Sequence, residues 1–338
     1  MCAMRSPSYS NVIEFYSEIA KKAVQLFYPE VSSIRLLNYS ENITYLAERK
    51  DGKGSAILRL NRPGYHTKKE LEAELIWMMA IKNHTSIIVP EPIAGANGQF
   101  IQEIADVNNS GQPYHCVMFS YLKGETPDEM NENELLFHFE NLGEITAHLH
   151  NHVENWKESK IICRPTWEYE TMLGKKAKWG RWQDGLGITP QLVQLFEKVS
   201  NTIYHRLNRF GKTPDRFGLI HADLRLANLL VESDQLKVID FDDCGFGWYL
   251  YDLAAALSFI EHKDYVPDLI QSWLKGYKKV RTLSKEEGEE IPTFIMLRRL
   301  MLIGWISSHS DNETAQKMGA EFTFQTVPLA EKYLYRYG

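Results

Sequence analysis

Four polar residues that follow apolar runs carry the clearest chemical signal in this sequence. Residues 219–230 read Leu-Ile-His-Ala-Asp-Leu-Arg-Leu-Ala-Asn-Leu-Leu, so strand-like segments flank a loop that holds His221, Asp223 and Asn228. A further strand-like run ends directly before Asp240. Two carboxylates and an amide at this spacing suit phosphoryl transfer, in which a protein positions a hydroxyl nucleophile and neutralises phosphate charge with a metal ion.

Phosphoryl transfer requires oxygen-bearing side chains for two separate tasks. One carboxylate accepts the proton of the attacking hydroxyl, while an asparagine and a second carboxylate hold Mg²⁺, a hard cation that prefers oxygen ligands. The pattern H-x-D-x-x-x-x-N, followed by I-D-F-D, supplies both. The alternative is that these residues only cap turns, which requires the spacing and the flanking strands to coincide by chance. The pattern therefore favours a magnesium-dependent phosphotransferase.

The same stretch resembles the catalytic loop of the aminoglycoside phosphotransferase and choline kinase family of protein-kinase-like enzymes. The closer likeness is to bacterial RdoA-type stress-response kinases and type II homoserine kinases. The family loop is written H-G-D-x-x-x-x-N, and residues 221–228 match it except that Ala222 replaces the glycine. The resemblance implies that Asp223 is the catalytic base, Asn228 a Mg²⁺ ligand and Asp240 the main Mg²⁺ ligand. The departure at Ala222 concerns loop geometry rather than chemistry.

Three further aspartates lie close to this constellation in the sequence. Asp252, in Leu-Tyr-Asp-Leu-Ala-Ala, resembles the family aspartate that braces the catalytic loop from the next helix. A helical N-cap would look the same in sequence. Asp242 and Asp243 are placed to recruit a cation or a substrate ammonium, although a solvated turn explains them equally well.

A cation and a carboxylate in the N-terminal third match the phosphate-binding pair of kinases. Arg59, in Ile-Leu-Arg-Leu, occupies the third-strand position where kinases place a lysine, and the resemblance assigns it to the nucleotide phosphates. Arginine adds a bidentate geometry that lysine lacks. Glu74 in the following helix fits the partner carboxylate, with Glu72 as the competing choice. An exposed arginine and an exposed helical glutamate are the alternative interpretation.

The run from 117 to 124, Val-Met-Phe-Ser-Tyr-Leu-Lys-Gly, resembles the hinge between kinase lobes. Backbone groups from Ser120 to Leu122 would then meet the adenine edge, whereas an ordinary edge strand is the alternative. The sequence G-x-x-x-x-G-K-[ST] does not occur, which excludes a P-loop kinase. The cofactors implied by the resemblance are ATP, or another nucleoside triphosphate, and Mg²⁺.

Apolar periodicity and turn residues predict the elements that position these side chains. Strands are expected near 34–39, 43–49, 55–60, 100–104 and 116–122, and helices near 11–28, 67–82, 132–150, 190–209, 264–281, 291–308 and 314–335. Pro29 stops the first helix, and a turn at 51–54 precedes the third strand. With the resemblance, this predicts an α+β, bilobal protein-kinase-like fold with a small mixed β-sheet N-lobe, one main helix there, and a larger, mainly helical C-lobe. Residues 1–122 would form the nucleotide-binding lobe, and 123–338 the lobe with the catalytic loop and acceptor site.

Composition restricts the class of partner. A chain of 338 residues is too long for one compact core, which agrees with two lobes. The net charge of -6, without a basic run, argues against nucleic acid. Four scattered cysteines suggest reduced thiols, and neither a signal peptide nor a membrane-length apolar run is evident. We therefore expect a cytoplasmic protein with no membrane partner. The sequence does not specify an oligomeric state.

The acceptor is expected to be the hydroxyl of a small molecule such as an amino alcohol, amino acid or aminoglycoside. Only 11 residues separate Asp240 from Asp252, which leaves no room for the extended segment on which typical protein kinases seat a peptide. An RdoA-type Ser/Thr protein kinase remains an alternative, because those relatives share the short segment. A pseudokinase scaffold is the other alternative, although a scaffold has no need of Asp223.

Three other groups of residues receive a structural interpretation. His148 and His152 have the i, i+4 spacing of a zinc-binding pair, but no third ligand is evident, and His150 matches a common structural histidine of the family. The tryptophans within 154–190 are expected to anchor that loop-rich insert, with substrate stacking as the alternative. The adjacent arginines at 298 and 299 are expected on a helix face near solvent.

Overall fold

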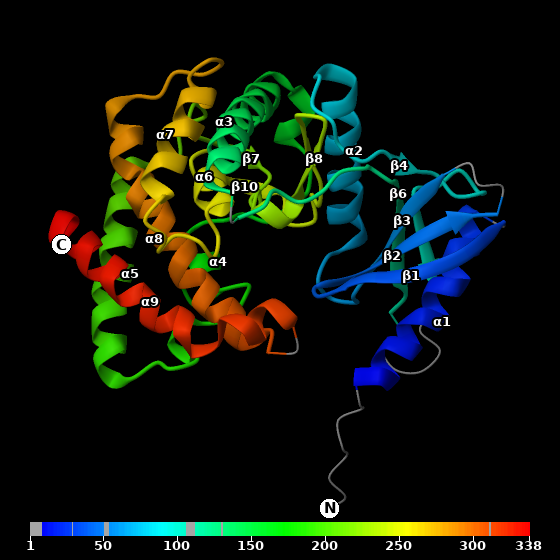
Figure 1. The fold of residues 1–338 in the computed structure, drawn as a ribbon, viewed down its shortest axis with the longest axis horizontal. Coiled ribbons are helices and arrows are strands. Elements are labelled where there is room, and N and C mark those ends of the chain that lie inside the picture. Colours follow the sequence, from blue (N-terminus) through cyan, green and yellow to red (C-terminus); the bar gives the residue numbers. More distant parts are fainter. Residues whose placement is uncertain (1–8, 29, 51–53, 106–111, 130, 311) are drawn as a thin grey trace, which may run out of the picture. The chain divides into compact units, whose positions relative to one another are not determined.

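The chain is described by a computed structural model that covers residues 9–28, 30–50, 54–105, 112–129, 131–310 and 312–338 (Figure 1). It forms two compact units. Unit 1 contains Met1–Ala80 and Pro90–Leu122, and unit 2 contains Ile81–Val89 and Lys123–Gly338. Pro29 and most of the turn expected at 51–54 lie outside the described residues.

Unit 1 is built on a six-stranded sheet whose strands follow the order β1-β2-β3-β6-β4, with β5 also paired to β6. The strands are β1 (Val31–Tyr39), β2 (Asn42–Arg49), β3 (Ser55–Asn61), β4 (Pro92–Ile93), β5 (Ile101–Ile104) and β6 (Tyr114–Ser120). Each described strand pair is antiparallel, so the sheet is not mixed as expected from the sequence. Only a few residues separate β1 from β2 and β2 from β3 along the chain, and such short connections allow only antiparallel pairing.

Two helices accompany this sheet. Helix α1 (Tyr9–Phe27) buries Ala20, Ala23 and Val24 against apolar side chains of β2, β3 and β6, which forms the core of unit 1. Helix α2 (Lys68–His84) begins at a reciprocal capping box, in which the Thr67 N–H donates to Glu70 and the Glu70 N–H donates to the Thr67 hydroxyl. The last turn of α2 belongs to unit 2.

Unit 2 is mainly helical. Its α-helices are α3 (Glu132–Asn155), α4 (Tyr169–Met172), α5 (Pro190–Phe210), α6 (Tyr251–Ala256), α7 (Val266–Tyr277), α8 (Lys285–Ser308) and α9 (Glu313–Tyr337). Helices α3 and α7 approach closely because Gly143 and Gly276 lie at their contact (Figure 1). A Cβ atom at Gly276 would lie 1.8 Å from the carbonyl oxygen of Glu140, so only glycine permits this packing.

Two small antiparallel sheets frame the loop that carries His221, Asp223 and Asn228. Strand β7 (Phe217–Ile220) enters the loop and pairs with β10 (Gly245–Trp248). After a short 3₁₀ turn at Leu226–Asn228, β8 (Leu229–Glu232) pairs with β9 (Gln235–Val238), and Asp240 follows two residues later. The strands expected around the polar loop are therefore present, and their ends set its position.

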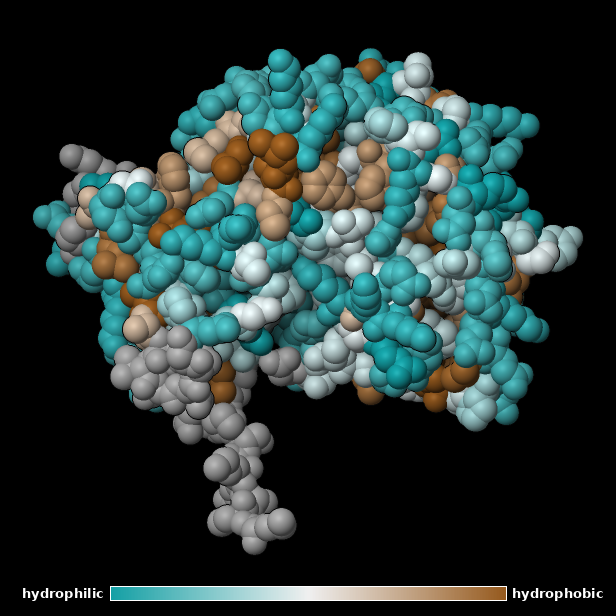
Figure 2. Space-filling view, turned by 180° about the vertical axis from the view of Figure 1, so that it is seen from behind, coloured by the Kyte–Doolittle hydropathy of each residue, from teal (hydrophilic) through white to brown (hydrophobic). Residues whose placement is uncertain are grey.

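Helix α8 lies in the core of unit 2. It has the length and apolar composition of a membrane span, so the expectation that no run approaches that length was wrong. However, 78% of its most apolar window is buried inside the protein, as in the core helix of a globular domain. The face in Figure 2 is largely hydrophilic, with apolar side chains in small groups between polar ones.

The tryptophans of the insert are buried, which confirms their anchoring role. Trp156, Trp167, Trp179 and Trp182 are each at most 7% exposed. The Trp167 indole N–H donates to the Asp243 carbonyl at 2.7 Å, and Trp182 packs edge-on against Phe196 of α5. The insert is thereby tied to the segment after Asp240 and to the helical core.

Candidate active site

Asp252 holds the backbone of the loop that contains His221 and Asp223. Its Oδ1 accepts the Ala222 N–H at 2.7 Å, and its Oδ2 accepts the His221 N–H at 3.3 Å. Helix α6 has no side-chain cap, so the carboxylate serves the loop rather than its own helix. This confirms the bracing role expected from the sequence. Ala222 adopts a φ of +67°, a left-handed conformation that explains why glycine is the usual residue there.

A buried histidine fixes the orientation of this brace. His150 of α3 is fully buried, and its Nε2 lies 3.1 Å from Asp252 Oδ2 while its Nδ1 lies 2.9 Å from the Tyr277 hydroxyl. Burial lowers the pKa of His150 despite the neighbouring Asp252 carboxylate. The neutral imidazole then donates one hydrogen bond to Asp252, which agrees with the structural role expected for His150.

Asp223 lies at the centre of a buried polar cluster. Its Oδ1 accepts from Arg298 Nη2 at 2.5 Å, and its Oδ2 accepts from Asn228 Nδ2 at 2.7 Å and from Arg225 Nε at 3.2 Å. Three donors on two oxygens fix the plane of the carboxylate. Four acceptor sites are available on an ionised carboxylate, so one remains for a further proton or hydrogen bond.

The surrounding charges keep Asp223 ionised. Burial alone would raise the pKa of Asp223, but the positive charges of Arg225 and Arg298 outweigh it, and the pKa lies below its ordinary value. The side chain is therefore a carboxylate at neutral pH, which is the form that a proton acceptor requires.

The prediction that Arg298 and Arg299 lie on a helix face near solvent was wrong. Both are buried in α8, with 1% and 0% of their surface exposed. Arg298 donates to Asp223, Tyr251 and the Ser258 hydroxyl, and its guanidinium lies over the Trp179 ring at 5.1 Å. The signal was present in the sequence, because two arginines inside an apolar helix are rarely buried without partners.

Asn228 and Asp240 present the oxygen atoms that a hard cation prefers. The Asn228 amide nitrogen donates to the carboxylate and carbonyl of Asp223, so its Oδ1 is the atom available as a ligand. The Ile239 N–H donates to the Asn228 carbonyl at 3.0 Å, which places Asp240 one residue from this contact. Asp240 is exposed and has a φ of +62°, a strained conformation for a non-glycine residue. This donor set fits Mg²⁺.

In unit 1, Arg59 and Glu74 form a buried bidentate ion pair. Arg59 Nη1 lies 2.8 Å from Glu74 Oε1, and Nη2 lies 2.6 Å from Oε2. Glu74 is fully buried whereas Glu72 is exposed, so the expected pairing with Glu74 is confirmed. The pair joins β3 to α2 in the way that kinases join their phosphate-binding cation to a helix. Its contact with nucleotide phosphates stays a prediction.

The hinge residues are placed at the end of β6. The Ser120 N–H donates to the Glu91 carbonyl, and the Ser120 hydroxyl accepts the Glu91 N–H, both at 2.8 Å. The backbone N–H and the hydroxyl of Ser120 therefore already have hydrogen-bond partners within unit 1. Leu122 follows the strand and ends unit 1, so its backbone is the better candidate for the adenine edge.

A profile of the phosphotransferase enzyme family (APH) matches residues 35–285, about three quarters of the chain. The chain belongs to this family. This kinase is also similar to a solved structure, a microcompartment-associated aminopropanol kinase, with 38% identity and a TM-score of 0.85 over 95% of this chain and 98% of the other. The recognition of the family, the α+β kinase-like fold and the enzyme class are confirmed by these similarities.

Two more distant relatives extend the comparison. Amicoumacin kinase of Bacillus subtilis (strain 168) is 25% identical over 293 residues, covering 83% of this chain and 82% of the relative. The amicoumacin kinase hAmiN, solved with AMP-PNP, Ca²⁺ and Ami, is 21% identical with a TM-score of 0.75 over 96% of each chain. The expected cofactors, ATP and Mg²⁺, are consistent with the contents of that complex. These relatives are named as kinases of small molecules, and the chain described here is a kinase of the same phosphotransferase family.

Proposed function

We propose that this kinase transfers the γ-phosphoryl group of ATP to the hydroxyl of a small amino alcohol. The observation that carries the proposal is the Asp223 carboxylate, which Arg298, Asn228 and Arg225 hold ionised and fixed in orientation. A buried, oriented carboxylate with one free acceptor site suits a general base for a hydroxyl nucleophile.

In the proposed reaction, the acceptor oxygen attacks the γ-phosphorus while the bond between that phosphorus and the β,γ-bridging oxygen breaks. Asp223 accepts the hydroxyl proton, which later leaves to solvent, and ADP is released. Bound Mg²⁺, held by Asn228 Oδ1 and Asp240, would neutralise phosphate charge. Arg59, oriented by Glu74, would bind the phosphates of the nucleotide, and the backbone at Leu122 would bind its adenine.

The amino group of the acceptor is supported by two observations. The similarity at 38% identity is to an enzyme that acts on aminopropanol. Asp242 and Asp243 follow closely after the proposed metal ligand Asp240, and anionic clefts concentrate cations. Against the amine, the insert carries basic residues such as Lys175 and Lys176. The short segment between Asp240 and Asp252 favours a small acceptor over a peptide. We also infer a cytoplasmic enzyme.

The acceptor is tested with matched alcohols. Acceptor-dependent ADP release is measured with 1-amino-2-propanol, with its neutral analogue 1,2-propanediol, with homoserine and aminoglycosides, and with a serine-containing protein. We expect the amino alcohol to be preferred over the diol by at least ~10-fold in kcat/KM, or about 1.4 kcal/mol of transition-state stabilisation. A diol or a protein that is the better substrate by that margin would exclude the amine while leaving the kinase assignment intact.

The catalytic assignment is tested with Asp223→Asn. General-base loss lowers turnover by ~10²–10⁴. The amide introduced by this substitution would also present an NH₂ group to the donors Arg225 and Asn228, so folding is verified by melting temperature and nucleotide binding by calorimetry. Asp264→Asn, at an exposed aspartate of the same unit, is the matched control. Turnover of the folded Asp223→Asn variant within a few-fold of wild type would exclude Asp223 as the base.

A further inference from the structure

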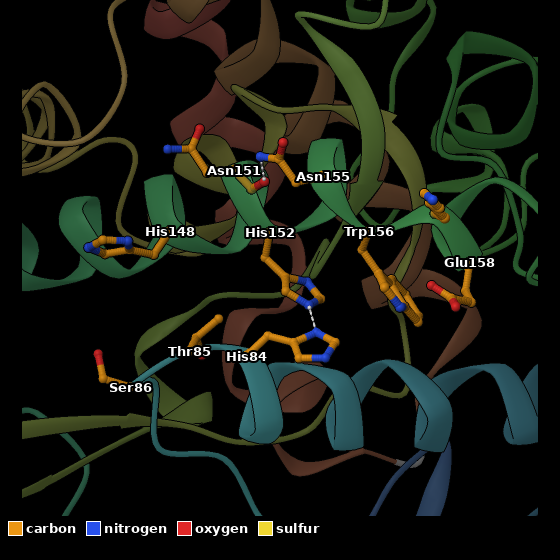
Figure 3. Close-up of a pocket in the computed structure, with 10 residues that line it drawn as sticks. His84, Thr85, Ser86, His148, Asn151, His152, Asn155, Trp156 and Glu158 are labelled. Atoms are coloured by element: carbon orange, nitrogen blue, oxygen red, sulfur yellow. Dashed lines mark hydrogen bonds between the residues drawn. The ribbon is translucent and has the colours of Figure 1, made fainter.

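A cavity of about 720 Å³ lies in unit 2, between the last turn of α2 and one face of α3 (Figure 3). Its lining includes three of the protein's 11 histidines. His84 comes from α2, and His148 and His152 come from α3; Thr85, Trp156 and Glu158 also line it. All of these residues are distinct from those assigned above to phosphoryl transfer.

Two of the histidines are in direct contact. His84 Nδ1 lies 3.2 Å from His152 Nε2, as the dashed line in Figure 3 shows, and the ring planes are inclined by 33°. His152 is only 9% exposed, and its Nδ1 is a buried nitrogen without a hydrogen-bond partner among the described residues. Burial, followed by the proximity of His84, lowers the pKa of His152 to about 4. The ring is therefore neutral at pH 7, and with its proton on Nδ1 the Nε2 that faces His84 carries a lone pair for a Lewis acid.

The third histidine lies one helical turn away. His148 and His152 have the i, i+4 spacing that places two imidazoles on one face of a helix, which is the spacing of zinc-binding H-x-x-x-H segments. His148 is exposed, and its ring turns along α3 away from the pair (Figure 3). The three rings do not converge in the observed conformation, so metal binding requires a change in the rotamer of the exposed His148 side chain that turns its ring toward His152. His84 is the third imidazole, and the sequence alone did not place it beside His152.

We propose that His84, His148 and His152 form a binding site for a divalent transition metal of the Zn²⁺ class. Zinc–nitrogen bonds of about 2.0–2.1 Å in a tetrahedral site separate the two nitrogens by about 3.3–3.4 Å. The observed 3.2 Å is close to that separation. For both facing nitrogens to bind the cation, the ring that carries the N–H between them moves this proton to its other nitrogen, and both rings turn toward the ion, which lies to one side of the line between the nitrogens. Water from the open cavity takes the fourth position. Imidazole nitrogens select borderline metals over Mg²⁺, so this site is independent of the proposed catalytic one.

Metal binding is measured on the full chain, without nucleotide and in excess Mg²⁺. Zn²⁺ affinity is determined by competition with a chromophoric chelator, and Co²⁺ is used to read the ligand type from its absorption spectrum. We expect one equivalent with tetrahedral Co²⁺ bands in the visible and no thiolate charge-transfer band. Zn²⁺ should also raise the melting temperature of the wild type.

The variants separate this site from adventitious binding. His148→Ala removes an exposed ligand without disturbing the core and should weaken Zn²⁺ binding by at least ~10-fold, because losing a direct ligand costs no less than losing an outer-sphere partner. His84→Asn should do the same, and the exposed His205→Ala is the matched control with unchanged affinity. Equal affinity in wild type and His148→Ala, a thiolate band, or no binding at ~100 µM metal would each overturn the proposal.

Discussion

Replacing Arg298 tests whether the orientation of Asp223 matters for catalysis. In Arg298→Met the side chain keeps its approximate length but loses its charge and its hydrogen bonds to Asp223, Tyr251 and Ser258. Asp223 keeps Arg225 and Asn228 as partners on its other oxygen. The variant therefore leaves one carboxylate oxygen buried without its donor.

The expected losses of stability and of kcat in Arg298→Met follow from the burial of this ion pair. Removing one partner of a buried charge pair destabilises a protein by about 3–5 kcal/mol. Because Arg225 and Asn228 still donate to Asp223 in the variant, we expect a loss of stability near the lower end, about 3 kcal/mol. If most of that free energy orients Asp223 in the transition state, kcat falls by ~10–100-fold, since about 1.4 kcal/mol corresponds to tenfold. KM for ATP should change little, because Arg298 is not among the residues assigned to the nucleotide. Arg298→Lys keeps the positive charge but loses the planar guanidinium with its several fixed N–H donors, so we expect a kcat between those of the wild type and Arg298→Met.

The assay is steady-state ADP release at saturating acceptor, with the folded fraction determined by urea unfolding. Arg299→Met is the matched control, because Arg299 is equally buried on the same helix but pairs with Glu261 instead of Asp223. We expect that control to lose stability while the folded enzyme keeps its kcat. A kcat for Arg298→Met within threefold of wild type, or an equal loss in both variants, would refute the positioning role.

Three further predictions follow from the site and the cavity. Asp240→Ala should weaken Mg²⁺–ATP binding in calorimetry, because it removes the principal anionic ligand; unchanged affinity would mean that Asp240 is not a ligand. Asp252→Asn should destabilise unit 2 by about 2–3 kcal/mol in urea unfolding and lower kcat, because an amide cannot accept from Ala222, His221 and His150 together; wild-type stability would contradict the bracing role. His152 stays neutral in the folded state until pH about 4, whereas the unfolded chain binds its proton near pH 6.5, so stability should fall as pH drops through that window. After allowance for solvent screening the effect is roughly 1 kcal/mol, and His152→Gln should remove it from the pH profile of unfolding.

Much of the fold could be predicted because its signals are local. Three kinds of signal each depend on neighbours within a few positions: the apolar runs of strands, the periodicity of helices, and the glycine and proline residues that end elements. Most predicted elements match the observed ones within a few residues. The catalytic-loop pattern is also local, which is why His221, Asp223 and Asn228 could be assigned to one loop. The sequence does not decide whether Glu72 or Glu74 pairs with Arg59, because both lie on the same helix. Their burial in the folded structure distinguishes them, since Glu74 is buried and Glu72 is exposed.

The sequence by itself determined which residue types are available to this protein and how they are spaced along each element. It places an aspartate and an asparagine in one polar loop, a second aspartate after a later strand, an arginine on the third strand, and two histidines one helical turn apart. The tertiary structure decided which of them meet. Arg298 reaches Asp223 across 75 positions, and His84 meets His152 across 68. No local pattern encodes such contacts, because they depend on how several helices pack together and exclude water. Burial by that packing converts an arginine that appeared solvent-facing into the partner of a proposed catalytic base.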